Sequence, residues 1–328
     1  MRRREFIKLL GGAATGWPLA VRAKERTARI GALFSFTETN PESKGLVTAV
    51  EKQLNAAGWH KGRNLEIDYR WAASDPERFA RAAEELVRAA PDVLLAFATP
   101  ALIPLKKSAT SIPIVFSAVS DPIGQGFVTN LARPGGNITG FSNYDPDIGG
   151  KWLQLLKEVA PLATNVTVMF NPQTSPYNVL WMRSIEAAAP RLSMAPMQGS
   201  VQNDEDIRRI IGLLKTKPGS GLIVPSDPFT YERSAMIASL AASSQIPAIY
   251  AYPRFAHDGG LIAYGVDLTD QVRRAAEYVG RILNGENVRN LPVQTPTRYT
   301  LTINLKTAKA LDLNVPPSLL ATADEVIE

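Results

Sequence analysis

Two Asp-Pro pairs stand where apolar stretches end, and their carboxylates are the first candidates for chemistry. Asp121 follows the run PIVFSAVS, and Asp227 follows GLIVPS. A carboxylate in a pocket accepts strong hydrogen bonds from a ligand ammonium group. Asp-Pro also opens turns and caps helices, so each aspartate has a purely structural alternative. We place both in a candidate binding site and leave the two roles open.

Hydroxyl and aromatic residues accompany these aspartates at the ends of other apolar runs. Thr99 and Ser117, with backbone N–H groups at a helix start, could hold a carboxylate without an arginine. Aromatic rings at such positions could stack on a flat apolar group, although they could equally be core residues. The complete set of predicted ligand-binding residues is Ser35, Phe36, Thr99, Ser117, Asp121, Asn171, Tyr177, Asp227, Tyr252, Tyr264 and Asp267.

The residue types needed for catalysis are scarce in this sequence. The chain has no cysteine, and its two histidines, His60 and His257, lie far apart. A nucleophile needs a base within reach, and a metal needs clustered ligands. Gly124 and Gly126 lack the third glycine of a dinucleotide-binding fingerprint, and no phosphate-binding G-x-x-x-x-G-K-[ST] motif occurs. We therefore predict a binding protein with no catalytic residues, metal or cofactor.

Strand-like and helix-like segments alternate along the chain and would position these residues. Continuous apolar strands that alternate with helices predict an α/β fold, with parallel sheets covered by helices on both faces. In such sheets, ligands bind beyond the carboxyl ends of the strands. The pattern begins at Ala28 and restarts after Gly140, and its strand-like segments are ARIGALFSF, LEIDYRWA, DVLLAFAT, PIVFSAV, NVTVMFN, GLIVPS and IPAIYAY.

The charge of the chain is concentrated at its N-terminus. The 328 residues carry a net charge of +5, and residues 1–23 hold five basic residues against one glutamate, 5 − 1 = +4. The remainder is nearly neutral, so we predict no nucleic-acid partner. The stretch Arg3–Lys8 resembles a twin-arginine export motif, and small residues precede a possible cut after Ala23. We therefore expect residues 1–23 to be a signal peptide and the mature chain to be periplasmic, without stable membrane insertion. Without a cysteine it would not be a lipoprotein.

Several blocks of the sequence closely resemble one family of bacterial solute-binding proteins. These blocks include GWHKGRNLEIDYRWA, PGGNITG, GGLIAYGVD and INLKTAKAL, and the likeness runs from about Ala28 to Glu328. The family is that of the ABC-transporter solute-binding proteins that includes the TrpX-type tryptophan and tyrosine binders. The resemblance implies a type I periplasmic-binding fold, with two doubly wound parallel-sheet lobes, a three-segment hinge and a ligand buried between the lobes. It also implies delivery of the ligand to a membrane permease powered by an ATPase subunit.

On this resemblance, the lobes and their crossings can be placed in the sequence. Residues 24–139 with 264–292 would form lobe 1, and residues 140–263 with 293–328 would form lobe 2. The crossings would be Pro134–Gly140, Gly259–Asp267 and Leu291–Tyr299, with glycines serving as hinge residues. The expected ligand is an amino acid, with aromatic ones among the candidates, or a related carboxylate. Two other functions remain open: an exported α/β enzyme with a cofactor or nucleotide in the cleft, and the ligand-sensing domain of a regulator.

Overall fold

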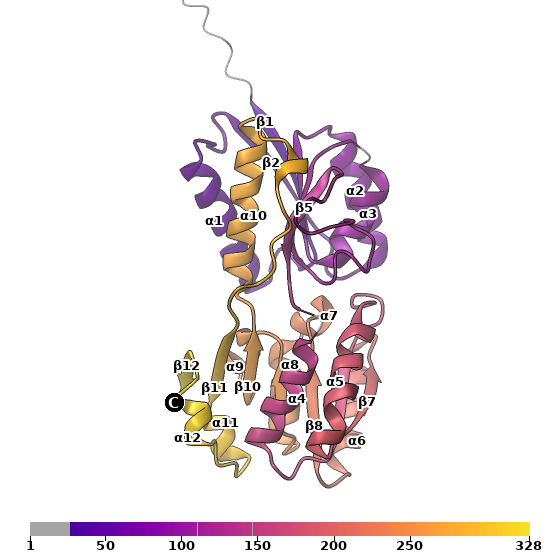
Figure 1. Ribbon diagram of the computed structural model, residues 1–328, viewed down its shortest axis with the longest axis vertical. Coiled ribbons are helices and arrows are strands. Elements are labelled where there is room, and N and C mark those ends of the chain that lie inside the picture. The colour runs from indigo at the N-terminus through magenta and orange to yellow at the C-terminus, as the bar shows by residue number, and fades with distance from the viewer. Residues whose placement is uncertain (1–26, 110, 146) are drawn as a thin grey trace, which may run out of the picture.

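The protein consists of two α/β lobes stacked along the long axis of the molecule (Figure 1). This computed structural model describes residues 27–109, 111–145 and 147–328. The predicted signal peptide, residues 1–23, lies outside the described residues. Each lobe has its own sheet with helices on both faces, so the predicted fold class is confirmed.

Lobe 1 is built on a five-stranded sheet in the order β2-β1-β3-β4-β5, in which every pair is parallel. Its strands are β1 (Ala28–Phe34), β2 (Leu65–Trp71), β3 (Val93–Phe97), β4 (Ile114–Val119) and β5 (Ile138–Ser142). Its helices are α1 (Pro41–Ala56), α2 (Pro76–Arg88), α3 (Thr99–Ser108) and α10 (Leu268–Leu283), with the 3-10 turn η1 (Val288–Asn290).

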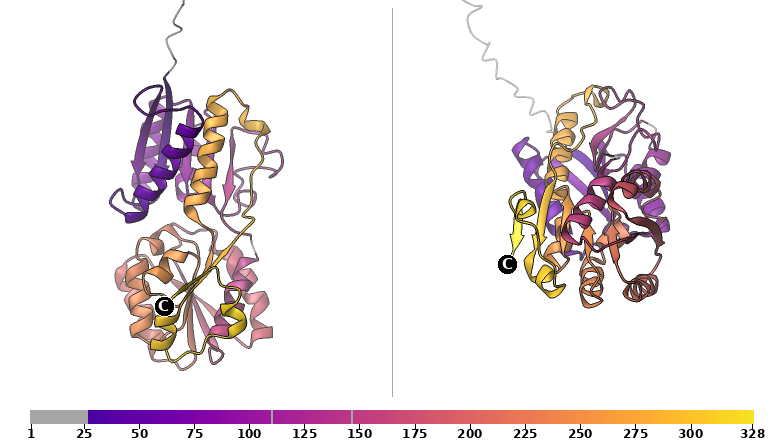
Figure 2. Two further views of the ribbon diagram at one scale, coloured as in Figure 1. Left: turned by 90° about the vertical axis from the view of Figure 1, so that its left-hand side faces the viewer. Right: turned by 60° about the horizontal axis from the view of Figure 1, so that its bottom comes forward.

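The helices of lobe 1 begin at side chains that cap them and cover opposite faces of the sheet. The Asp75 carboxylate accepts hydrogen bonds from the N–H groups of Glu77 and Arg78, and Pro76 occupies the first turn of α2. This helix buries the stripe that its sequence spacing predicts, including Phe79 and Leu86. The late helix α10 lies beside α1 (Figure 2), whereas α2 and α3 pack together on the other face.

Lobe 2 is built on a seven-stranded sheet in the order β12-β11-β10-β9-β8-β6-β7. The pair β10–β11 is antiparallel, so this sheet is mixed rather than purely parallel. Its strands are β6 (Asn165–Phe170), β7 (Ala195–Ser200), β8 (Ser220–Val224), β9 (Ala248–Tyr250), β10 (Ile262–Gly265), β11 (Thr300–Asn304) and β12 (Glu325–Ile327). Its helices are α4 (Ile148–Val159), α5 (Asn178–Leu192), α6 (Asp204–Lys215), α7 (Pro228–Tyr231), α8 (Ser234–Ser243), α9 (Pro253–His257), α11 (Leu305–Ala310) and α12 (Pro317–Leu320).

The core of lobe 2 contains two fully enclosed tryptophans. Trp152 of α4 and Trp181 of α5 meet edge to face, with ring centroids 5.6 Å apart. The Trp152 indole N–H donates a hydrogen bond of 2.8 Å to the carbonyl oxygen of Tyr264. Because a buried indole keeps its polar atom satisfied in this way, the pair fixes α4 and α5 against the strand that leads into the second crossing.

The first crossing between the lobes lies a few residues later than the sequence indicated, whereas the second and third lie within the predicted segments Gly259–Asp267 and Leu291–Tyr299. β5 pairs with β4 within lobe 1, so the chain first crosses after Ser142. β10 belongs to the sheet of lobe 2, so the second crossing follows Gly265, and Gln294 still bonds to lobe 1 before the third. Gly140 is therefore a strand residue and not a hinge. Its φ is +152°, and an added Cβ would lie 2.1 Å from the Phe116 carbonyl oxygen, which requires glycine there.

None of the helices in the described part of the chain combines the length and the apolar composition needed to cross a membrane.

Candidate ligand-binding cleft

The carboxyl ends of the lobe 1 strands bring hydroxyl groups to the junction between the lobes. Thr99 begins α3 directly after β3, and its Oγ1 accepts a hydrogen bond of 3.2 Å from the Ser120 N–H. Ser117 lies within β4 and Ser120 directly after it, and both are buried. Ser35 is buried too, but its hydroxyl is already used, since it donates to the Phe97 carbonyl oxygen at 2.9 Å. The free hydroxyl groups of lobe 1 are therefore those at the end of β4.

Several residues near these hydroxyls have positive φ angles, a backbone conformation that is unfavourable for residues other than glycine. Ala98 has φ of 70°, Ala118 has φ of 58° and Asp121 has φ of 40°, although none of them is glycine. The loop after β2 repeats this feature, with Ala73 at φ 52° and Ser74 at φ 56°. Strained residues of this kind persist where the surrounding structure holds them, and they cluster at binding sites. All five follow or end strands at the lobe junction, as expected of a ligand-binding edge.

Asn143, the first residue of the first crossing, connects this edge to lobe 2. Its side-chain amide donates hydrogen bonds to the Ser226 hydroxyl at 2.6 Å and to the Tyr252 hydroxyl at 3.0 Å. Ser226 and Tyr252 also bond to each other. Burial raises the pKa of Tyr252 to about 12, so this phenol stays neutral and remains a hydrogen-bond donor. The three side chains form one fixed polar cluster on the lobe 2 side of the cleft.

Asp227 is completely buried beside this cluster and holds two loops of lobe 2 together. Its carboxylate accepts hydrogen bonds from the N–H groups of Asn171 at 2.9 Å and Phe229 at 3.0 Å, and from the Thr174 hydroxyl. Burial raises its pKa to about 6, against the lowering effect of these hydrogen bonds. Asp227 is thus the N-cap of α7, which was the structural alternative, and it lies next to the cleft.

Tyr177 and Asn178 at the start of α5 extend the lobe 2 side of the cleft. The Tyr177 hydroxyl approaches the Ser226 carbonyl oxygen at 3.5 Å. Burial is the main cause that raises its pKa, so the phenol stays neutral and can donate a hydrogen bond. Asn178 is buried beside it as the first residue of the helix.

Buried atoms without a hydrogen-bond partner gather in this same region. Within the described residues, these atoms include Ser117 Oγ, Ser120 Oγ, Asn143 Oδ1 and both amide atoms of Asn178. Buried polar groups in folded proteins almost always have partners, because leaving one unpaired costs about 1–3 kcal/mol. Two hydroxyls from lobe 1 and two amides from the crossing and lobe 2 are therefore suited to bind the polar groups of a small molecule.

Aromatic rings close the cleft on the side of α7. Phe36 of lobe 1 stacks on Tyr231 of lobe 2, with centroids 4.8 Å apart and planes 15° apart. Tyr231 in turn meets Tyr252 edge to face at 5.1 Å. Beside these rings lies a cavity of about 300 Å³, which Tyr231, Tyr252 and Arg254 help to line. Aromatic rings and buried polar groups therefore lie side by side at the lobe junction, and charged residues such as Glu42 and Arg254 line the adjoining cavity.

The structure brings most of the predicted site residues together but places two, Asp121 and Tyr264, elsewhere. Asp121 is partly exposed, and its carboxylate accepts the Gly124 N–H at 2.9 Å within its own loop. Asp267 is exposed and caps α10, and it helps to line the cavity beside Tyr231 and Tyr252. Tyr264 packs on Tyr299 at 5.5 Å and lines a groove beside α4 and the C-terminal segment. The residues at the lobe junction are Ser35, Phe36, Thr99, Ser117, Asn171, Tyr177, Asp227 and Tyr252.

Sequence reasoning missed five residues of the cleft. Ser120 and Ser226 directly precede the two Asp-Pro pairs. The sequence analysis therefore identified the correct loops but selected the aspartates instead of the serines beside them. Asn143, Asn178 and Tyr231 were missed because nothing in their local sequence distinguishes them from ordinary turn and helix residues. Their role depends on contacts between distant segments.

Comparison with known proteins agrees with this architecture. A protein from Vibrio cholerae of solved structure is 26% identical and has a TM-score of 0.84, covering 92% of this chain and 100% of its own. An ABC domain from Streptococcus pneumonia in complex with L-Trp is 24% identical, with a TM-score of 0.83 over 92% of this chain and 100% of its own. The ligand-free, open structure of a substrate-binding protein with adhesive properties from Clostridium difficile is 26% identical and covers 92% and 99%, with a TM-score of only 0.66.

A curated relative and a family match complete the comparison. A tyrosine-binding protein from Clostridioides difficile is 28% identical over 291 residues, which are 88% of this chain and 82% of the relative. Residues 39–327 match the family described as ABC transporter substrate binding protein. Two α/β lobes that meet at a cleft are the architecture of two-lobed binding proteins, and the family match assigns this chain to the solute-binding proteins. Within that class, the chain belongs to the ABC transporter substrate binding protein family.

Proposed function

We propose that the protein captures an α-amino acid with an aromatic side chain in the cleft and delivers it to an ABC permease. The observation that carries this proposal is the set of buried, partnerless hydroxyl and amide atoms that the two lobes turn toward one junction. The ligands named for two relatives, tyrosine and L-Trp, support the same cargo class.

The carboxylate of the amino acid would bind to lobe 1. The Ser117 and Ser120 hydroxyls can donate hydrogen bonds there, and Thr99 adds a third hydroxyl at the start of α3. No side chain caps this helix at Ala98, so its N-terminal end still carries the partial positive charge of the helix dipole. Hydroxyl donors and a helix end can hold a carboxylate without a positively charged side chain.

The ammonium group and the side chain would bind to the other groups of the cleft. The Asn143 and Asn178 amide oxygens can accept hydrogen bonds from an ammonium, and the nearby buried carboxylate of Asp227 attracts its charge. The rings of Phe36, Tyr231 and Tyr252 offer apolar surface to an aromatic side chain. Both lobes thus have to close on the ligand to satisfy its polar ends, which couples binding to closure.

Isothermal titration of ligand-free protein tests the cargo class. The protein is unfolded, dialysed and refolded, then titrated with L-tyrosine, L-tryptophan, L-phenylalanine and the matching deaminated acids. We expect binding of at least one amino acid and at least about tenfold weaker binding of its deaminated acid, because a buried charged contact is lost. Absence of binding across the panel would contradict the proposal.

A matched pair of serine variants tests the residue assignment. Ser120→Ala removes a partnerless hydroxyl from the cleft, and Ser243→Ala removes an exposed hydroxyl at the end of α8. We expect Ser120→Ala to weaken binding by about 1–2 kcal/mol, whereas Ser243→Ala leaves the affinity unchanged. Equal affinities for the two variants would remove Ser120 from the ligand site.

We further propose that the chain is exported by the twin-arginine route and works in the periplasm with a permease and an ATPase. The basic stretch Arg3–Lys8 supports the route, and the family supports the partners. Cell fractionation of the wild type and of an Arg3→Lys/Arg4→Lys variant tests the route. Retention of that variant in the cytoplasm is expected, and equal export of both proteins would count against the twin-arginine route.

A further inference from the structure

Segment 35–42, which is the loop after β1 together with the first two residues of α1, contacts lobe 2 at three separate points. Phe36 stacks on Tyr231, as described above. The Thr37 N–H donates a hydrogen bond of 2.7 Å to the Glu232 carboxylate, and the Glu42 carboxylate accepts one of 2.8 Å from Arg254. A single lobe 1 segment therefore spans α7 to α9 on the surface of lobe 2.

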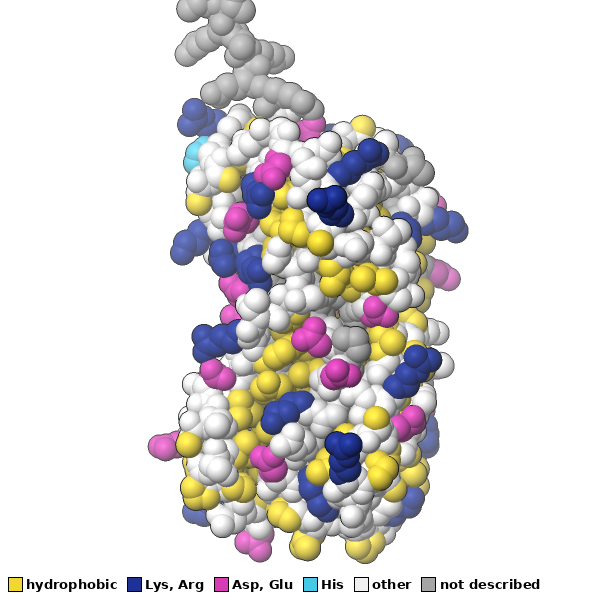
Figure 3. Space-filling model, viewed as in Figure 1, with side chains coloured by type: hydrophobic (Ala, Val, Ile, Leu, Met, Phe, Trp, Pro, Cys, Tyr) yellow, Lys and Arg dark blue, Asp and Glu magenta, His cyan; other side chains and the backbone are white. Residues whose placement is uncertain are grey.

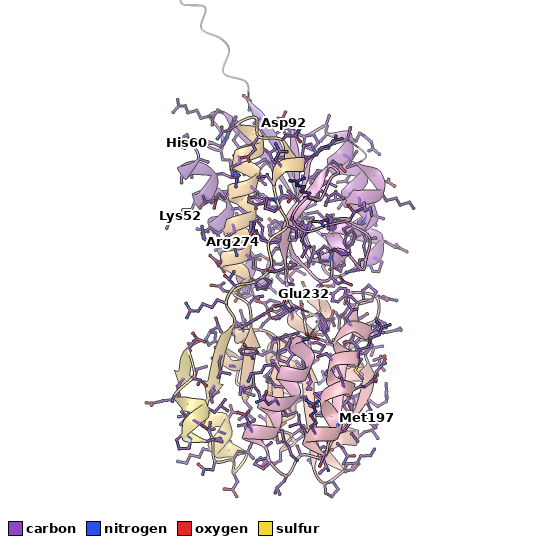
Figure 4. All side chains as sticks on the ribbon, viewed as in Figure 1. Lys52, His60, Asp92, Met197, Glu232 and Arg274 are labelled. Carbon is purple, nitrogen blue, oxygen red and sulfur yellow. The ribbon has the colours of Figure 1, made fainter. Side chains whose placement is uncertain are left out.

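Glu232 of lobe 2 binds to the backbone of lobe 1. Its carboxylate accepts the Thr37 N–H at 2.7 Å. Figure 4 shows Glu232 at the junction between the lobes. Burial raises the pKa of Glu232, because its carboxylate is partly withdrawn from water at this junction. A carboxylate from lobe 2 thus contributes a charged hydrogen bond to the contact between the lobes.

The Glu42–Arg254 pair forms a second bridge. Arg254 also binds Asp258 of its own lobe at 2.8 Å, so its guanidinium is oriented before lobe 1 meets it. Arg254 and Glu42 are about one quarter and one third exposed. A partly buried, pre-oriented pair of this kind is less weakened by salt than an ordinary surface ion pair.

These contacts lie where they can resist opening. In the left view of Figure 2, the crossing segments pass on one side of the waist and α1, in indigo, overhangs the other side. Figure 3 shows the waist narrowing between the lobes, with acidic side chains around it. Contacts opposite a hinge must break when the lobes separate, whereas the crossings only bend.

We propose that segment 35–42, with Glu232 and Arg254, is a latch that holds the lobes closed and sets ligand affinity through the closed–open equilibrium, with no ligand contact from Glu232. The latch stabilises the closed state and so increases the fraction of molecules in that state. Because only the closed state retains the ligand, a larger closed fraction gives a higher apparent affinity. The latch goes beyond the proposed cargo and holds for any small molecule in the cleft.

The distance between the lobes measures the latch without any ligand. The chain has no cysteine, so Lys52→Cys and Met197→Cys allow a nitroxide on each lobe; both positions are exposed and lie on opposite lobes (Figure 4). Double electron–electron resonance is recorded for this labelled protein and for versions carrying Glu42→Gln, Glu232→Gln, both changes, or the control Asp204→Asn. Asp204 pairs with Arg233 at 2.5 Å within lobe 2 only.

We expect each glutamine variant to shift the closed–open equilibrium toward the open state. The double variant should change the equilibrium constant by about tenfold or more, because it loses two hydrogen bonds to charged groups. The control should keep the wild-type distribution. Thermal unfolding identifies any variant that fails to fold, and the remaining glutamine variant still gives the answer. Unchanged distributions in the glutamine variants, or an equal shift in the control, would overturn the latch.

A second measurement rests on the proposed function and is therefore kept separate. With L-tyrosine and L-phenylalanine as probes, Glu232→Gln should weaken both affinities by the same factor and leave their ratio unchanged. A changed ratio would place Glu232 in the ligand site and contradict the proposal. Failure of both amino acids to bind wild-type protein would refute the cargo class while leaving the distance measurement valid.

Discussion

Buried polar atoms carry most of the functional information at the scale of single residues. Sequence reasoning selected Asp227 as an ammonium acceptor, whereas the structure shows three hydrogen bonds that already organise its carboxylate. Ser120 and Asn143 were not selected, yet each has a buried atom without a partner. Residue type predicts what a side chain can do, but only its neighbours determine which of its atoms remain free.

The buried carboxylate of Asp227 predicts a specific pH dependence of stability. Its pKa is raised from 3.8 to about 6 in the folded protein, so folding takes up a proton between these values. Raising the pH from 4 to 7 should therefore lower this residue's contribution to the free energy of unfolding by up to about 3 kcal/mol. Chemical denaturation of wild type and Asp227→Asn at several pH values measures the effect. The stability difference between them should change by that amount over this range, and a constant difference would contradict it.

At the scale of elements, the hydrophobic pattern predicted most strands and helices, but not the first crossing or the exact lobe boundaries. Apolar runs and caps such as Asp75 are local features, so α2 begins and packs as its sequence indicates. The assignment of β5 and β10 to one lobe or the other depends on pairing with strands distant in sequence. The antiparallel β10–β11 pair has no local signature either, and for that reason the predicted boundaries were early by a few residues.

A matched pair of glycine substitutions tests the packing of β5. Gly140→Ala would place its Cβ 2.1 Å from the Phe116 carbonyl oxygen, whereas an alanine at Gly45 in α1 meets nothing within 4 Å. We expect Gly140→Ala to destabilise the protein by more than about 2 kcal/mol through backbone displacement. Gly45→Ala should stabilise it by about 0.5–1 kcal/mol because helices favour alanine. Thermal or urea unfolding measures both, and a neutral Gly140→Ala would refute the close-packing argument.

At the scale of the whole molecule, the two lobes are joined by direct contacts as well as by the crossings. Phe36 stacks on Tyr231, and the Glu232 and Arg254 side chains bond to lobe 1. Partnerless atoms come from both lobes and from the first crossing, so the cleft is complete only in this arrangement. The sequence predicted that a cleft exists, but not which faces meet in it, because closure depends on contacts such as Phe36 with Tyr231.

A ligand held by both lobes should stabilise both of them. Differential scanning calorimetry with L-tyrosine at about 100 times its dissociation constant should raise the free energy of unfolding by about 2.7 kcal/mol. If the lobes unfold in separate transitions, both transitions should move to higher temperature. Movement of one transition alone would show that the ligand binds a single lobe, in conflict with the assignment of Ser120 and Asn178 to one site.

The interleaved connectivity has a consequence for biosynthesis. Helix α10 packs on α1, and β11 pairs with β10, so each lobe needs segments from the last quarter of the chain. A nascent polypeptide therefore leaves the ribosome with the sheet of lobe 2 unfinished and with one face of lobe 1 not yet covered by α10, and such intermediates are prone to aggregate. Chaperones that shield emerging chains should consequently remain engaged until translation has passed residue 304, where β11 ends.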